Sequence, residues 1–202
     1  MDDFYHTVAR FATAEIKVKG SRFIAEVNNV GSAENAQELL NSIRKKEHAA
    51  THHCFAYRIG CSEKQEFKYS DDGEPSGTAG KPIYDCLLGR ELTNAIVVVT
   101  RYFGGTKLGT GGLARAYVDA ARQALDKAGK KTVFVTDRLI LQFDLKYYDQ
   151  VQKVLSKFTV EQVSSDFSEA ARLTIGVRKS MTKELIEVLT NLTNGQIKIK
   201  SE

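Results

Sequence analysis

The residues with the clearest chemical potential lie between positions 95 and 117, where the sequence reads AIVVVTRYFGGTKLGTGGLARAY. Five glycines fall within nine residues of this stretch, and three cations stand beside them. A glycine-rich turn exposes backbone N–H groups, and a helix N-terminus adds positive charge, so both favour a bound anion. We therefore predict a phosphate-binding surface at Arg101, Gly104, Gly105, Lys107, Gly109, Gly111, Gly112 and Arg115.

This loop matches neither of the two common nucleotide-binding motifs. Gly104 and Gly109 have the spacing of a phosphate loop, but Thr110 stands where that motif requires lysine. Residues 109–114 fit G-x-G-x-x-A, yet Gly109 comes nine residues after Thr100, where the expected strand ends. The alternative to an anion site is structural, because glycines also serve tight turns and close packing of a helix on a strand.

A second unusual stretch, DDGEPSGTAGKP, occupies residues 71–82. Its carboxylates Asp71, Asp72 and Glu74 could hold Mg²⁺, which prefers one or two carboxylates together with phosphate oxygens. Alternatively, hydroxyls in the same stretch could donate hydrogen bonds to phosphate, with a lysine as the nearby charge. We place Ser76, Thr78 and Lys81 in the predicted phosphate site on this ground. We assign no metal ligand and expect no cofactor, Mg²⁺ being the ion that the loop could accept.

The run His52, His53, Cys54 suggests a catalytic or zinc site at first sight. Neighbouring side chains on a strand point to opposite faces, so His53 and Cys54 cannot form a direct catalytic pair. His52 and Cys54 share a face, with Cα atoms roughly 6.6 Å apart, which is loose for a nucleophile and its base. The spacing to Cys61 is too irregular for zinc, and no hydrolase motif is present. We assign no catalytic residue.

The elements that position these stretches follow from hydrophobic periodicity. Residues 15–27 alternate as a hairpin around Lys19-Gly20, and Ser32 is suited to cap a helix over the following residues. Residues 51–59 alternate as a strand, and Pro82 can open a short helix. A strand at 95–100 then precedes the glycine loop, and a helix follows from about Leu113 to Ala128.

After residue 130 the pattern changes to alternating strands and two apolar helical stripes. Its order is βαββαβ, which is the ferredoxin-like order. We therefore expect two domains, residues 1–134 and 135–202, in an α+β protein.

Composition restricts the function classes. The chain has 202 residues, 42% hydrophobic content and a formal net charge of +4, of which +3 lies before residue 137. This mildly basic balance is compatible with a polyanionic partner. The sequence has no apolar run long enough to span a membrane and no recognisable secretory signal. Its three cysteines lack a disulfide pattern. We expect a cytoplasmic protein.

Three stretches together resemble the IMPACT/YigZ family in its bacterial two-domain type: ATHHCFAYRIG at 50–60, YSDDGEPSGTAGKPI at 69–83 and VVVTRYFGGTKLGTGGLARAY at 97–117. Thr106 departs from the family pattern, in which an aliphatic residue is common. The resemblance implies an N-terminal fold like domain 2 of ribosomal protein S5. It also implies a C-terminal domain like the last domain of elongation factor G. Eukaryotic relatives regulate translation by binding the activator of a stress-responsive kinase. No catalytic residue comes with the resemblance.

Three functions are consistent with these observations. The leading one is a non-catalytic RNA- or ribosome-associated protein linked to translation, in which Tyr102 and Phe103 could stack on bases. The second is a Mg²⁺-dependent enzyme acting on a phosphorylated small molecule or nucleotide. The third is a protein-binding regulatory module.

Overall fold

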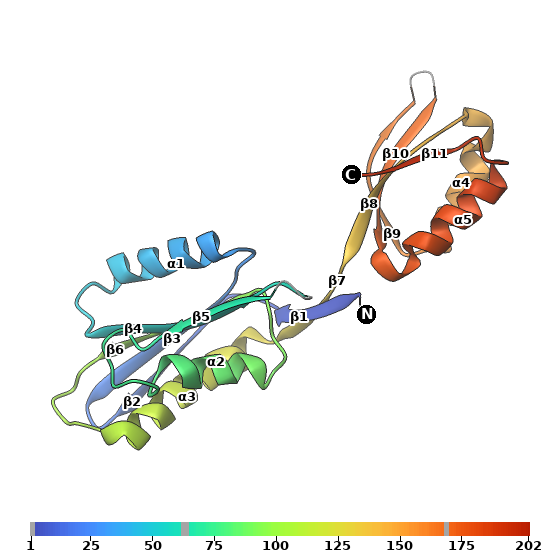
Figure 1. Ribbon diagram of the computed structural model, residues 1–202. Helices are drawn as coiled ribbons and strands as arrows, with labels where there is room; N and C mark the ends of the chain where they lie inside the picture. The colour runs from blue at the N-terminus through green and yellow to red at the C-terminus, as the bar shows by residue number, and fades with distance from the viewer. Residues whose placement is uncertain (1–2, 62–64, 168–169) are drawn as a thin grey trace. The chain divides into compact units, whose positions relative to one another are not determined.

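The computed structural model describes residues 3–61, 65–167 and 170–202 (Figure 1). It divides into two compact units: Tyr5–Val133, and Phe134–Glu202 together with Phe4 near the N-terminus. Both units combine helices with antiparallel sheet, so the chain is an α+β protein with two domains. Two short strands, β1 (Phe4–Val8) and β7 (Lys130–Phe134), pair with each other outside the main sheets.

The N-terminal unit is built on a five-stranded sheet in the order β2-β3-β6-β4-β5. All four neighbouring pairs are antiparallel. The strands and the three helices of this unit are β2 (Ala12–Val18), β3 (Ser21–Asn29), α1 (Ala33–Lys46), β4 (His52–Ile59), β5 (Glu66–Ser70), α2 (Gly80–Leu88), β6 (Ala95–Tyr102) and α3 (Gly109–Ala128).

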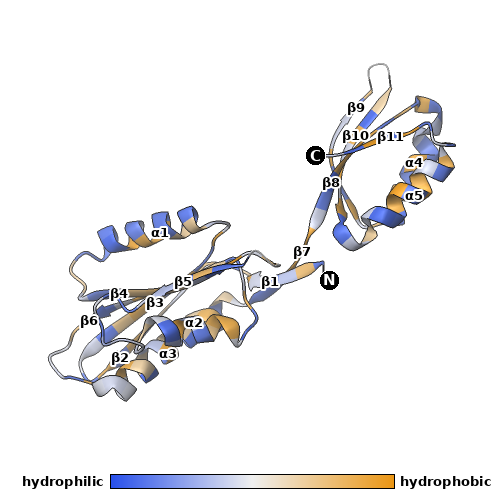
Figure 2. Cartoon of the chain, in the orientation of Figure 1, coloured by the Kyte–Doolittle hydropathy of each residue, from blue (hydrophilic) through white to orange (hydrophobic). Residues whose placement is uncertain are grey.

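Helices cover both faces of this sheet, α1 on one side and α2 with α3 on the other (Figure 1). The alternation predicted for residues 51–59 explains how β4 serves both layers. Phe55, Tyr57 and Ile59 pack under α1, whereas Cys54 and Ala56 belong to the core beneath α2 and α3. Figure 2 shows α1 mostly hydrophilic, which agrees with a helix that buries one stripe of side chains, Ala36, Leu40 and Ile43.

Several local predictions are confirmed. The hairpin turns at Lys19-Gly20, both of which have positive φ. Ser32 caps α1 by accepting a hydrogen bond from the Asn35 amide, and Arg44, Lys45 and Lys46 occupy the last turn. These cations interact favourably with the partial negative charge at the C-terminal end of the helix dipole.

Two boundaries near the glycine loop differ from the prediction. The strand continues past Thr100 to Tyr102, because its outer residues pair with Arg22 and Phe23 of β3. Helix α3 begins at Gly109 rather than near Leu113. Glycine disfavours helix, so the periodicity of apolar residues underestimates the length of a helix whose first turn is glycine-rich.

The C-terminal unit contains the predicted βαββαβ order. Its sheet runs β11-β8-β10-β9, with antiparallel neighbours throughout. Two 3₁₀ turns precede the two helices, and all of these elements contribute to one hydrophobic core. The bounds are β8 (Thr136–Phe143), a 3₁₀ turn (Leu145–Tyr147), α4 (Tyr148–Leu155), β9 (Val160–Asp166), β10 (Ala171–Arg178), a 3₁₀ turn (Lys179–Met181), α5 (Thr182–Leu192) and β11 (Lys198–Ser201).

Within the described ranges, no helix has the length and apolar content that crossing a bilayer requires.

Candidate functional site

The acidic loop between β5 and α2 is held by its own first carboxylate. Asp71 accepts the amide of Gly77 on Oδ2 at 2.9 Å and the amides of Ala79 and Gly80 on Oδ1 at 2.9 and 2.8 Å. Burial raises the pKa of Asp71, but the three amide donors outweigh burial and leave that pKa below its ordinary value. Asp71 therefore occupies the anion position at the start of α2 itself.

Asp72 joins the loop to two other elements. Its Oδ1 pairs with the Arg44 guanidinium of α1 at 2.7 Å, and its Oδ2 accepts the His53 backbone amide at 2.7 Å. Its carbonyl lies 2.8 Å from His52 Nδ1. Asp72 and Gly73 have φ of 45° and 88°, the left-handed conformation in which glycine is the least strained residue. The loop thus lies across the first residues of β4.

Glu74 is the centre of a buried polar cluster. Its Oε1 accepts hydrogen bonds from Arg101 Nη1 at 2.6 Å and from the Tyr117 hydroxyl at 2.7 Å. His52 Nε2 lies 3.9 Å from the same oxygen. The side chains of Glu74 and Arg101 are only 3% and 6% exposed. The acidic loop is therefore adjacent to the end of β6, where the glycine loop begins.

Cys54 lies beneath this cluster, with its Sγ 3.0 Å from the Asp71 carbonyl oxygen and 3.3 Å from the Tyr117 hydroxyl. Burial raises the pKa of the Cys54 thiol far above its usual range, and burial does the same to the pKa of Tyr117. Only the thiolate is a strong nucleophile. The cluster therefore contains no activated cysteine.

This difference between the cysteines predicts the result of thiol labelling. Cys61 is exposed, whereas Cys54 and Cys86 are buried and burial raises the pKa of both. We expect a disulfide reagent at pH 8 to modify Cys61 rapidly in the native protein and the other two only on unfolding. Mass spectrometry of the labelled peptides measures this, with Cys61→Ser as the control. Rapid labelling of Cys54 in the C61S protein would contradict the buried arrangement.

The glycine loop joins β6 to α3 and is mostly exposed. Gly104 anchors the loop to the turn between β2 and β3. Its amide donates to Ser21 Oγ at 3.2 Å, and its Cα packs closely against the backbone of Gly20. Beyond it, Gly105 and Gly109 have φ of 84° and 69°, and the space around both is open. Close packing, the alternative role of these glycines, thus applies to Gly104, although its partner is the turn at Gly20 and not a helix. Gly105 lies in the exposed turn, and Gly109, Gly111 and Gly112 form the start of α3.

The first turn of α3 has neither a side-chain cap nor an acidic residue. Gly109 and Gly111 are exposed, and Gly112 is half-buried against Leu108. Lys107 and Arg115 are exposed, and neither cation has an ion-pair partner among residues 3–61, 65–167 and 170–202. These are the predicted phosphate contacts that the structure leaves available for a ligand.

Four other residues of the predicted phosphate site have different surroundings. Arg101 is buried in the ion pair with Glu74 instead of lying on the loop surface. The Thr78 hydroxyl is also buried and donates to the Pro75 carbonyl at 2.6 Å. Lys81 pairs with Asp85 one helical turn away, and Ser76 is exposed. Arg101, Thr78 and Lys81 are thus each engaged by another group of the protein, whereas Ser76 is exposed like Lys107 and Arg115.

The carboxylates of the acidic loop do not converge. Asp71 faces backbone amides, Asp72 faces Arg44, and Glu74 faces Arg101 and Tyr117. Across the described part of the chain, no three His, Cys, Asp or Glu side chains are grouped closely enough to hold a metal ion. Each carboxylate of the loop is already paired with donors of the protein itself.

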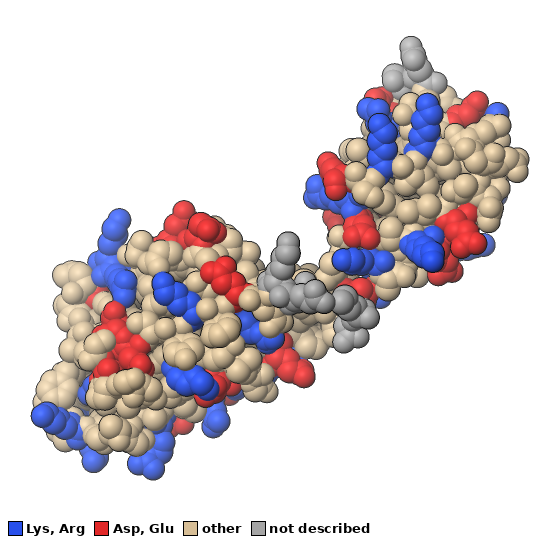
Figure 3. All heavy atoms as spheres, in the orientation of Figure 1, with Lys and Arg blue, Asp and Glu red and all other residues tan. Residues whose placement is uncertain are grey.

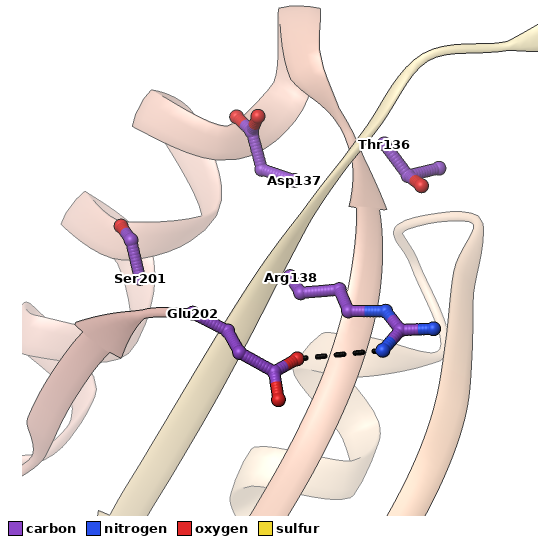
Figure 4. A pocket seen from close by; sticks show the side chains of 5 residues that line it. All are labelled: Thr136, Asp137, Arg138, Ser201 and Glu202. Carbon is purple, nitrogen blue, oxygen red and sulfur yellow. Dashed lines mark hydrogen bonds and ion pairs between the residues drawn. The ribbon is translucent and has the colours of Figure 1, made fainter. Parts of the chain in front are cut away.

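A hollow in the C-terminal unit is lined by five residues of β8 and the chain end (Figure 4). Arg138 spans it to Glu202 at 3.5 Å, and both side chains are at least half exposed. The lining consists of Thr136, Asp137, Arg138, Ser201 and Glu202. Such an open surface ion pair contributes little energy and supplies no enclosed site.

Comparison with known proteins places this geometry in a family. The model of the Impact N-terminal domain matches residues 19–125, which include every residue of the buried cluster. A second family model, a domain of unknown function, matches residues 141–196. YvyE of Bacillus subtilis strain 168 is 37% identical over 203 residues, covering 97% of this chain and 90% of YvyE. The chain belongs to the IMPACT family.

Within the IMPACT family, the chain is of the bacterial two-domain type, like YvyE and like YigZ of Escherichia coli strain K12. A crystal structure described as a hypothetical protein aligns with a TM-score of 0.72 at 28% identity. The alignment covers 100% of this chain and 98% of the other. A structure of Yih1, described as a two-domain translational regulator, is 30% identical over 61% of this chain and 47% of its own, with a TM-score of 0.39.

Sequence reasoning missed the buried cluster as a unit. It noted that Arg101, Glu74, His52 and Cys54 are unusual, but it treated them as members of separate motifs. One signal was present: Arg101 has the same strand parity as Val97 and Val99, whose side chains face the α3 core. This parity points the Arg101 side chain inward, where a buried cation requires a carboxylate partner.

Proposed function

We propose that this IMPACT-family protein is a nucleic-acid- or ribosome-associated protein linked to translation, which binds phosphate backbone through the exposed part of the glycine loop. The observation that carries the proposal is the pairing of an uncapped, glycine-rich start of α3 with two exposed cations, Lys107 and Arg115. The link to translation comes from the family resemblance. The phosphate contacts come from the loop.

The loop can bind phosphate without any catalytic group. The backbone at Gly109 and Gly111 is open to a phosphodiester. Neither residue has a Cβ, and the space where a Cβ would stand is empty of surrounding protein atoms within 4 Å. The positive end of the α3 dipole favours an anion there, and Lys107 and Arg115 add two full charges. Arg101 fixes the loop from inside, through Glu74, and is a supporting residue in this proposal. Phe103, which is 49% exposed at the beginning of the loop, is available to contact bases or sugars.

Removing the two exposed cations is expected to change the salt dependence of binding. With Lys107→Ala and Arg115→Ala together, the slope of log affinity against log salt should become shallower by about 1.4 to 2, since each phosphate contact contributes about 0.7 to 1. Co-sedimentation with ribosomes across a potassium chloride series measures this. The control is Lys45→Ala with Lys157→Ala, which removes two exposed cations elsewhere. Equal slopes for the parent protein and the K107A/R115A variant would contradict the assignment.

The finer names of the two folds also belong to this proposal. We infer that the N-terminal sheet is of the ribosomal protein S5 domain 2 type, and that the C-terminal unit is ferredoxin-like and similar to the last domain of elongation factor G. The second inference is supported by the observed strand order, because β11-β8-β10-β9 is 4-1-3-2 in the numbering of that unit. We place the domain boundary at residues 134 and 135.

A further inference from the structure

A second feature of the N-terminal unit is an aromatic cluster at the edge of its sheet. Strand β5 is the edge strand beside β4, and its Phe67 and Tyr69 side chains are 54% and 40% exposed. Their ring centroids are 6.5 Å apart, and the two ring planes differ by only 15°. Exposed aromatic rings on neighbouring same-face positions of a strand are unusual, because such side chains normally seek burial.

Tyr84 of α2 supports this pair. Its ring centroid lies 5.0 Å from that of Phe67 and 5.7 Å from that of Tyr69, with interplanar angles of 28° and 34°. Tyr84 is only 9% exposed, so the buried ring packs against the two exposed ones and restricts their positions. The result is a fixed pair of nearly parallel aromatic rings that present open surface to solvent.

The surroundings of the pair combine polar and apolar side chains. Asp85 and Leu88 of α2 are exposed. Glu66 and Lys68 alternate with the rings along β5 and point to its other face, where Glu66 accepts a hydrogen bond from the Tyr57 hydroxyl. Lys81 pairs with Asp85, and this hydrogen bond chiefly raises the pKa of Lys81, while the hydroxyls of Tyr69 and Tyr84 act in the same direction. Lys81 precedes Tyr84 by three residues on α2, so its half-exposed side chain lies on the same side of the helix as that ring.

We propose that Phe67 and Tyr69 form a stacking platform for unpaired bases of single-stranded RNA. This proposal builds on the nucleic-acid function proposed above and adds a second contact surface to it. Unpaired bases stack on exposed aromatic side chains, and strand residues two positions apart are suited to neighbouring bases.

The size and chemistry of the patch favour bases over a protein partner. A stable protein interface buries on the order of 1,200–2,000 Å² in total, far more than two rings provide. Figure 3 shows basic and acidic side chains intermingled on the face in view, without one continuous basic field. Ring faces are the feature that nucleobases recognise.

Replacing both rings with leucine tests the platform while keeping apolar cover over Tyr84. In fluorescence anisotropy with a labelled oligouridine, Phe67→Leu with Tyr69→Leu should weaken binding at least tenfold, because base stacking on each ring contributes substantially. The salt slope should stay that of the parent, since no phosphate contact is removed. Phe11→Leu, at another exposed phenylalanine, is the matched control and should bind like the parent.

A tryptophan variant provides a direct readout. The chain has no tryptophan, so Phe67→Trp introduces a single reporter that keeps an aromatic ring. Its fluorescence should be quenched by oligouridine and its affinity should stay within about threefold of the parent. The proposal is overturned if the leucine variant binds as tightly as the parent, or if the parent does not bind oligouridine.

These outcomes are distinguishable from those of the proposed function. If Lys107→Ala with Arg115→Ala leaves ribosome co-sedimentation unchanged while the leucine variant loses oligouridine, the glycine-loop proposal fails and the platform stands. If the K107A/R115A variant loses co-sedimentation while the leucine variant binds oligouridine normally, the platform proposal fails and the glycine-loop proposal stands.

Discussion

Replacing Glu74 with alanine is expected to lower the free energy of unfolding of the N-terminal unit by about 3–5 kcal/mol, a large part of the stability of a typical domain. The reason is the charge that remains. The Arg101 side chain is 6% exposed, and its Nε already lacks a hydrogen-bond partner among the described residues. Removing Glu74 would leave the guanidinium buried without a carboxylate and would also remove the acceptor of the Tyr117 hydroxyl.

Hydrogen exchange read by mass spectrometry on the intact chain measures this effect segment by segment. Peptides from β6 and α3 should lose protection in Glu74→Ala, whereas peptides from β10 in the C-terminal unit serve as an internal reference. Asp126→Ala is the matched control, because it removes one carboxylate from the exposed pair with Arg90 and should cost less than about 1 kcal/mol. Equal protection in the Glu74 and Asp126 variants would mean that the buried pair does not stabilise the loop.

Much of the fold could be predicted from sequence because local patterns decided it. The turn at Lys19-Gly20, the Ser32 cap and the two-sided strand around Phe55 each follow from residues that are adjacent in the chain. The C-terminal βαββαβ order follows from clean alternation and two apolar stripes. These features do not depend on distant partners, so a single sequence contains enough information to place them.

The candidate site was harder because its contacts are long-range. Glu74 contacts Arg101, which is 27 positions away in the sequence, and Tyr117, which is 43 positions away. No local sequence pattern predicts either contact. The three cations near the glycine loop therefore suggested a uniformly exposed basic surface. One of them, Arg101, is instead buried and holds the loop in place through Glu74. The aromatic pair on β5 was missed for a related reason. Only the stacking of Tyr84 from α2 shows that the two rings are held in place.

Gly104→Ala is expected to have the second-largest effect on stability, because Gly104 contacts the backbone of a neighbouring turn, which a new side chain would displace. A Cβ at this position would lie 1.9 Å from the Gly20 carbonyl carbon, 2.1 Å from its oxygen and 2.2 Å from the Ser21 nitrogen. Steric overlap of this kind forces backbone shifts, which in packed regions cost about 1–3 kcal/mol and sometimes more. The turn between β2 and β3 would be pushed away from the glycine loop.

Gly111→Ala is the matched control, and the opposite sign of its effect makes the comparison decisive. Gly111 lies in the first turn of α3, has no positive φ and has open space around its Cβ position. Alanine there should stabilise the helix by about 0.5–1 kcal/mol. Thermal unfolding of the intact chain gives both signs, and ribosome co-sedimentation gives the consequence for binding. Because Gly104 fixes the end of the loop, Gly104→Ala should weaken binding although it removes no charge. If both alanine variants unfold at the temperature of the parent, the contact with Gly20 does not restrain the loop, and the position of Lys107 must be set by the α3 end alone.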